Sequence, residues 1–114
     1  RAARTGAEGS GAITIGGLHI QPDSRTVTLD GEILTLTAGE YDILFSLARS
    51  LGKVKSRDDL MEEIRDREWQ AFDRSLDVHI SNLRRKMKDD PKEPRYIRTV
   101  RGVGYMMADP DSPR

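Results

Sequence analysis

Hydrophobic positions alternate with polar ones along the first third of the chain. Four short segments share this period of two and are rich in β-branched residues: 13–15, 18–20, 26–29 and 32–36. The first two segments flank Gly16-Gly17 and the last two flank Asp30-Gly31, and both dipeptides favour tight hairpin turns. The pattern therefore predicts a small antiparallel sheet with one buried face.

After residue 36 the apolar period lengthens to that of a helix. Thr37-Ala38-Gly39-Glu40 has the form of a capping box, which predicts a helix that begins there. The apolar positions of this helix share helical spacing: Tyr41, Leu44, Leu47, Ala48 and Leu51. We expect Tyr41 and Phe45 to join the core, and Gly52 to follow the last turn of the helix.

A second, shorter helix is predicted from Ser56, whose hydroxyl can cap it, to about Arg65. Asp58 and Asp59 lie in its first turn, where negative charge is favourable to the helix dipole. Its buried side is formed by Leu60, Met61 and Ile64. A charged connector, residues 65–71, follows this helix and contains the only tryptophan.

The third predicted helix has two sharply different faces. It follows Asp73, a suitable N-cap, and runs to about Lys88. One narrow stripe is apolar and is expected to face the core: Leu76, Ile80, Leu83 and Met87. The opposite face comprises Arg74, Val78, Ser81, Asn82 and Arg85. A valine exposed among polar side chains is unusual for a solvated helix, although a solvent-facing helix with an incidental valine is the alternative.

The outer face of this helix suits the major groove of DNA. Asparagine can bond adenine, arginine can bond guanine, and a valine methyl can contact a thymine methyl. His79 and Arg84 lie on the two flanks, in the direction of the phosphates. The chain has no net charge, yet residues 74–101 contain nine basic and four acidic residues. This local excess fits a footprint for phosphates, with ordinary charge variation on a solvated helix as the alternative.

A terminal hairpin follows the third helix. Residues 96–100 and 104–107 are predicted strands joined across Arg101-Gly102. Arg101 at this tip can enter a minor groove, where a narrow width concentrates negative potential. Thr99 can bond a phosphate. A plain surface hairpin would be preferred without the helix beside it; the two features together favour DNA binding.

Length and composition exclude several other classes of protein. The 114 residues fit one domain, with 1–11 as a linker, 12–107 folded and 108–114 as a flexible tail. There are no cysteines, and the separated His19 and His79 form no ligand cluster, so we expect no metal or cofactor. His19 alternates with apolar neighbours and should face solvent. No segment resembles a membrane span or a signal peptide, which predicts a fragment of a cytoplasmic protein. No catalytic constellation stands out, so we expect no enzyme.

Residues 72–86 and 94–105, together with 36–44, resemble the winged helix-turn-helix effector domain of OmpR/PhoB-type response regulators. The resemblance covers nearly all of residues 13–107 and implies an α+β fold. In this family a four-stranded N-terminal sheet precedes three helices and a C-terminal β-hairpin wing. It also implies sequence-specific binding to double-stranded DNA that controls transcription, with the third helix in the major groove and the wing in the minor groove.

The resemblance further assigns roles residue by residue. Base-facing positions would be Ser75, Val78, Asn82 and Arg85. Phosphate contacts would be Arg74, His79, Ser81, Arg84 and Thr99, and Arg101 would be the minor-groove arginine of the wing. The connector between the second and third helices would contact RNA polymerase, here through Arg67, Glu68 and Trp69.

Partners are implied in the same way. Family members carry an N-terminal receiver domain, phosphorylated on aspartate in a phosphorelay with a histidine kinase, and bind direct-repeat operators as homodimers. That receiver is missing from this sequence, and attachment to another upstream domain is an open alternative. A winged-helix module that binds a protein through Trp69 and the hairpin is the competing hypothesis. For Trp69 itself, packing onto the domain is the favoured interpretation, with exposure to a protein partner as the alternative.

Overall fold

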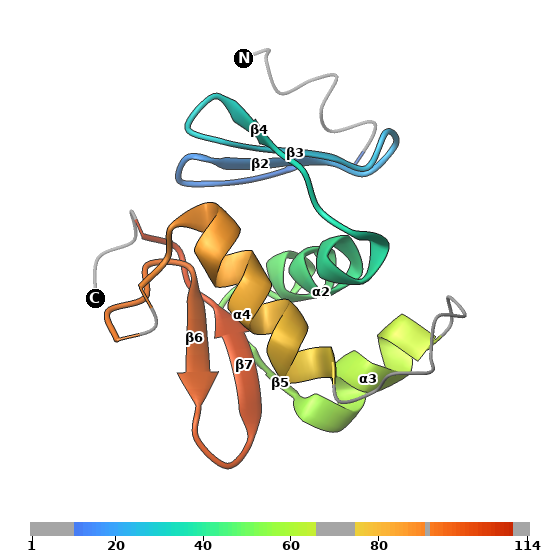
Figure 1. Ribbon diagram of the computed structural model, residues 1–114, viewed down its shortest axis with the longest axis vertical. Helices are drawn as coiled ribbons and strands as arrows, with labels where there is room; N and C mark the ends of the chain where they lie inside the picture. The colour runs from blue at the N-terminus through green and yellow to red at the C-terminus, as the bar shows by residue number, and fades with distance from the viewer. Residues whose placement is uncertain (1–10, 66–74, 91, 111–114) are drawn as a thin grey trace.

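A computed structural model describes residues 11–65, 75–90 and 92–110. The chain begins with a four-stranded antiparallel sheet in which each strand pairs with the next (Figure 1). Its strands are β1 (Ile13–Ile15), β2 (Leu18–Gln21), β3 (Thr26–Leu29) and β4 (Glu32–Leu34). All four match predicted segments, although β4 stops two residues earlier than predicted. At the β3–β4 turn, Asp30 and Gly31 both have positive φ, 52° and 87°, as a tight hairpin turn of this kind requires.

Helix α2 (Ala38–Arg49) begins at the predicted capping box. The Glu40 amide donates to Thr37 Oγ1 at 3.2 Å, and the Thr37 amide donates to Glu40 Oε1 at 3.1 Å. The predicted apolar stripe was wrong at its last position. The helix ends at Arg49, so Leu51 lies beyond it and is exposed.

Strand β5 (Val54–Ser56) was not predicted. It pairs with β7 (Gly104–Met107), which also pairs with β6 (Ile97–Val100), so the C-terminal hairpin becomes a three-stranded sheet in the order β5–β7–β6. A side chain at residue 104 would overlap the carbonyl group of Lys55, so glycine is needed for this close pairing. We call the β6–β7 hairpin the wing.

Helices α3 (Arg57–Arg65) and α4 (Ser75–Met87) complete the fold. Ser56 caps α3 as predicted, because its Oγ accepts the amide of Asp59 at 3.0 Å. Helix α4 ends one residue before the predicted Lys88. Its predicted N-cap, Asp73, lies outside the described residues.

The core lies where α4 crosses between the N-terminal sheet, α2, α3 and the wing (Figure 1). The whole predicted stripe of α4 is buried there: Leu76, Ile80, Leu83 and Met87. Tyr41 is buried and Phe45 packs against the core, as predicted. This is the winged helix-turn-helix arrangement that the resemblance implies. Among the described residues, no helix is both long enough and apolar enough to cross a membrane.

Candidate nucleic-acid interface

The face of α4 opposite the core stripe is open to solvent. Val78 is 50% exposed, and Ser81 and Arg85 are exposed as well. Arg85 Nη1 donates a 3.0 Å hydrogen bond to Asn82 Oδ1, one helical turn away. Burial of the opposite stripe fixes the rotation of the helix, so this polar face has to point outward. Arg74 and the side chain of Ser75, which were assigned to the same face, lie outside the described part.

One flank of α4 packs against the start of α2 rather than facing solvent. Lys86 Nζ donates to Glu40 Oε1 at 2.6 Å and to the Thr35 carbonyl at 2.9 Å, and Glu40 is only 2% exposed. Burial acts to raise the pKa of the Glu40 carboxyl, but hydrogen bonds from Lys86 and Thr37 outweigh burial and lower it. This flank therefore joins α4 to α2 through an ion pair whose carboxylate is buried and whose lysine is partly exposed.

His79 lies on this same flank, and both of its ring nitrogens are buried. Burial lowers the pKa of the imidazole, and the nearby charge of Glu40 opposes that shift only in part. The sequence expectation placed His79 at a phosphate. In the structure its nitrogens are shielded from solvent, because the flank of α4 is covered by its neighbours.

The opposite flank of α4 faces the wing and contains Arg84. Its Nη2 donates to Thr99 Oγ1 at 2.7 Å and to the Ile97 carbonyl at 2.9 Å. The guanidinium carbon also lies 6.0 Å from the centre of the Tyr105 ring. Arg84 and Thr99, both predicted to contact phosphates, thus bond to each other. The helical wheel could place Arg84 on a flank, but it gave no sign that the wing would lie against that flank.

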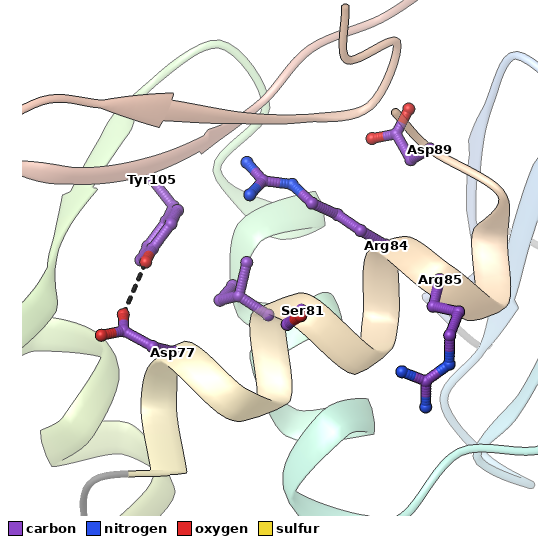
Figure 2. Close-up of a pocket in the computed structure, with 7 residues that line it drawn as sticks. Asp77, Ser81, Arg84, Arg85, Asp89 and Tyr105 are labelled. Atoms are coloured by element: carbon purple, nitrogen blue, oxygen red, sulfur yellow. Dashed lines mark hydrogen bonds between the residues drawn. The ribbon is translucent and has the colours of Figure 1, made fainter. Parts of the chain in front are cut away.

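Asp77, in the first turn of α4, forms a cluster that the sequence analysis missed. Tyr105 on β7 donates its hydroxyl to Asp77 Oδ1 at 2.8 Å (Figure 2). Arg57 at the start of α3 donates to both carboxylate oxygens, at 2.6 and 3.3 Å. Hydrogen bonds from Arg57 and Tyr105 lower the pKa of Asp77, while burial and the Asp77 carboxylate raise the pKa of Tyr105.

A hollow of about 420 Å³ separates the outer part of α4 from the wing. Ser81, Arg84 and Arg85 line it from the helix, and Tyr105 lines it from β7 (Figure 2). Arg84 extends toward the wing, whereas Arg85 points away from it. The two neighbouring side chains therefore point in different directions, Arg84 toward the wing and Arg85 away from it.

Asp89 fixes the base of the wing to the end of α4. Its buried carboxylate accepts the amides of Arg95 at 2.7 Å, Tyr96 at 3.2 Å and Ile97 at 2.9 Å. Three amides at the start of β6 are thereby satisfied by one side chain. The sequence analysis missed this role, since an aspartate just after a helix reads as an ordinary solvated residue.

The tip of the wing is exposed, as predicted for Arg101. Gly102 has φ of 76°, a conformation that favours glycine at the turn. Val103, to which the sequence analysis assigned no role, is exposed beside Gly102. Its carbonyl accepts the amide of Arg57 at 3.3 Å. The tip thus offers a cation and an apolar group together, and it is tied to α3.

The predicted polymerase contacts Arg67, Glu68 and Trp69 lie outside the described residues.

Comparisons with known proteins agree with this geometry. The family model described as transcriptional regulatory protein, C terminal, matches residues 31–107. The chain is 46% identical over 82 residues to the transcriptional regulatory protein AruR of Pseudomonas aeruginosa, covering 72% of this chain and 34% of AruR. It is 39% identical over 99 residues to CpxR of Escherichia coli, covering 87% of this chain and 43% of CpxR. The chain thus spans less than half the length of these two relatives.

A solved structure extends the comparison to the whole fold. The DNA-binding domain of RstA from Klebsiella pneumoniae, in complex with the RstA box, aligns with a TM-score of 0.76 at 41% identity. The alignment covers 86% of this chain and 97% of that domain.

Proposed function

The chain belongs to the family of C-terminal domains of transcriptional regulatory proteins, and on this premise we propose that it binds double-stranded DNA with sequence preference. It would act as the output domain of a two-component response regulator. The observation that carries the proposal is the open outer face of α4, directly opposite its buried stripe and next to an exposed wing tip. The RstA domain, solved with its DNA box, supports the same use of this fold.

Helix α4 would enter the major groove with its outer face toward the bases. Asn82 and Arg85 present the donors and acceptors that discriminate adenine and guanine, and Val78 presents methyl groups for thymine. The hydrogen bond between Arg85 and Asn82 holds both side chains outward before DNA arrives. Ordering these side chains in advance lowers the entropy lost on binding. Ser75 stays assigned to this face from the sequence.

The residues assigned to phosphates would reach the DNA backbone in different ways. Ser81 is exposed on α4 and Thr99 is exposed on β6, so both hydroxyls can reach a DNA backbone. Arg84 would act from its place against the wing, since its Nη2 is already bonded to the protein. His79 would need a change of side-chain conformation to reach a phosphate. Arg74 keeps its assignment from the sequence alone.

The wing would place Arg101 in the adjacent minor groove. Arginine is favoured there because a narrow groove concentrates negative potential. Val103 at the same tip is exposed and can pack on the sugar edges of the groove. A half-site would therefore combine a major-groove element read by α4 with a flanking minor-groove element read by the wing.

Residues 12–107 would form the binding unit, and two copies would bind a direct-repeat operator. One copy offers a single helix and a single wing, so tight binding needs a second copy on an adjacent half-site. An N-terminal receiver, its histidine kinase and contact of RNA polymerase with Arg67, Glu68 and Trp69 belong to the same proposal. The matched region covers only 34% of AruR and 43% of CpxR, so each of these relatives has room for a further domain.

Selection of bound duplexes from a random pool tests this function directly. We expect the chain to enrich a short motif, and its affinity for that motif to fall linearly with salt on logarithmic axes. The slope should be about 0.9 for each phosphate contacted. A pool that yields no motif, together with an affinity that salt does not change, would overturn the proposal. That outcome would favour the alternative of a protein-binding module.

A further inference from the structure

Three elements of the fold meet at the carboxylate of Asp77. Helix α4 supplies Asp77, the wing supplies the Tyr105 hydroxyl at 2.8 Å, and α3 supplies both Nη atoms of Arg57 (Figure 2 shows the first two). Arg57 also donates its backbone amide to the carbonyl of Val103, at the tip of the wing. One residue of α3 therefore bonds the wing tip through its backbone and α4 through its side chain.

The ion pair between Arg57 and Asp77 adds little to the stability of the fold. The side chains of Arg57 and Asp77 are 51% and 62% exposed, and exposed ion pairs of this type contribute about 0–1 kcal/mol. An acidic group at the start of a helix that approaches phosphates is also unfavourable for binding DNA, unless a cation compensates it. A stabilising role alone therefore does not explain why Asp77, Arg57 and Tyr105 meet at this position.

The wing is attached to α4 through both of its strands. On β6, Arg84 bonds Thr99 and the carbonyl of Ile97. On β7, Asp77 bonds Tyr105, which pairs directly with Thr99 across the hairpin. A single attachment would leave the tip free to swing about it. Two attachments, with the bond from Arg57 to Val103, set the direction in which the tip points.

We propose that Asp77 is a positioning residue that fixes the wing tip relative to α4, so that the major-groove and minor-groove elements are read only at one spacing. The inference rests on the proposed function. Asp77 itself touches no base in this scheme. It acts through Tyr105 and Arg57, and its removal would relax the required spacing while leaving the bases read by α4 unchanged.

The test uses the full chain and two duplexes. The first contains the motif selected by the unaltered chain, and the second has one base pair inserted between the α4 element and the flanking wing element. We expect the unaltered chain to bind the second duplex at least about tenfold more weakly, a loss comparable to that for one mismatched pair. Asp77→Ala should bind the two duplexes within about threefold of each other, less than the effect of one mismatch.

Two further variants separate positioning from charge and from folding. Asp58→Ala removes an exposed acid from the first turn of α3 and should keep the full discrimination. Tyr105→Phe deletes only the hydroxyl that bonds Asp77, so it should reproduce the loss of discrimination in a folded chain. Hydroxyl-radical footprints of Asp77→Ala and Tyr105→Phe should lose protection over the wing element and keep it over the α4 element, whereas Asp58→Ala should keep both.

The outcomes distinguish this inference from the proposed function. Discrimination that survives in both Asp77→Ala and Tyr105→Phe would overturn the positioning role, and so would an equal loss in Asp58→Ala. In those cases the function would stand, because the unaltered chain still selects a motif. An unaltered chain that selects no duplex at all would overturn both.

Discussion

Arg84 on α4 donates a 2.7 Å hydrogen bond to the hydroxyl of Thr99 on β6, so two side chains expected at the DNA backbone contact each other within the protein. The same guanidinium also bonds the carbonyl of Ile97. The wing is therefore part of the surface on which α4 rests, and a change at Arg84 acts on the orientation of the wing as well as on charge.

A double-mutant cycle should detect this contact. Arg84→Ala and Thr99→Val are each expected to lower the free energy of unfolding, with a coupling energy of about 1 kcal/mol between them. Urea denaturation of the single and double variants measures it. Strictly additive effects would mean that the hydrogen bond contributes nothing. Arg84→Ala should also weaken binding to all duplexes to a similar extent.

Asn82→Ala should relax sequence preference at one base position. The amide is the group on the outer face of α4 suited to adenine, and its loss should cost about 1–3 kcal/mol against the preferred base. Competition among duplexes randomised at single positions measures the effect. Thr28→Ala, on the N-terminal sheet, serves as the control and should leave every position unchanged. Equal losses on specific and random duplexes for Asn82→Ala would contradict a base contact.

Arg101→Ala should weaken DNA binding through the wing alone. We expect the salt slope to fall by about 1 and the preference for A·T pairs in the flanking minor groove to disappear. Lys53→Ala is the matched control, since it removes an exposed cation from the turn before β5, at the other end of the C-terminal sheet from the wing tip. A similar change in slope for both variants would indicate general attraction rather than a groove contact.

Asp89→Asn should destabilise the domain by about 2–3 kcal/mol, because its carboxylate is buried and accepts three backbone amides. The asparagine amide group would place a donor against these donors. Asp90→Asn provides the control, as Asp90 is exposed next to it in the chain. Urea unfolding of both variants measures the difference. Equal stability of the two would show that Asp89 does not anchor β6.

Acidification should reduce stability in two stages. Burial lowers the pKa of His79 from its ordinary 6.5, so the unfolded chain binds that proton more readily and stability declines as pH falls below about 6.5. The lowered pKa of Glu40 gives a second decline below about 4.5, as its bond to Lys86 is lost. Unfolding measured across this range in His79→Gln should lack the first stage. Loss of the same stage in His19→Gln instead would contradict the assignment to His79.

Local patterns in the sequence determined most of the elements. The Asp30-Gly31 turn, the capping box at Thr37 and the apolar stripe of α4 each depend on residues within one or two turns of one another. These interactions form with the same geometry wherever the segment lies, so they can be read from a linear pattern. The stripe also determined which face of α4 points outward, and with it the exposure of Val78 and Arg85.

Contacts between distant segments were decided only by the tertiary structure. Strand β5 is three residues long and exists because β7, some fifty residues later, pairs with it. The bonds of Arg84 to Thr99 and of Asp77 to Arg57 and Tyr105 likewise join residues 15 to 28 positions apart, and the bonds of Asp89 to the start of β6 cross the loop after α4. No periodic pattern encodes such pairs, because each depends on how helices and hairpin pack against one another. The sequence thus determined which face of α4 points outward, and the packing decided which charged side chains of that helix are free to contact a ligand on this face.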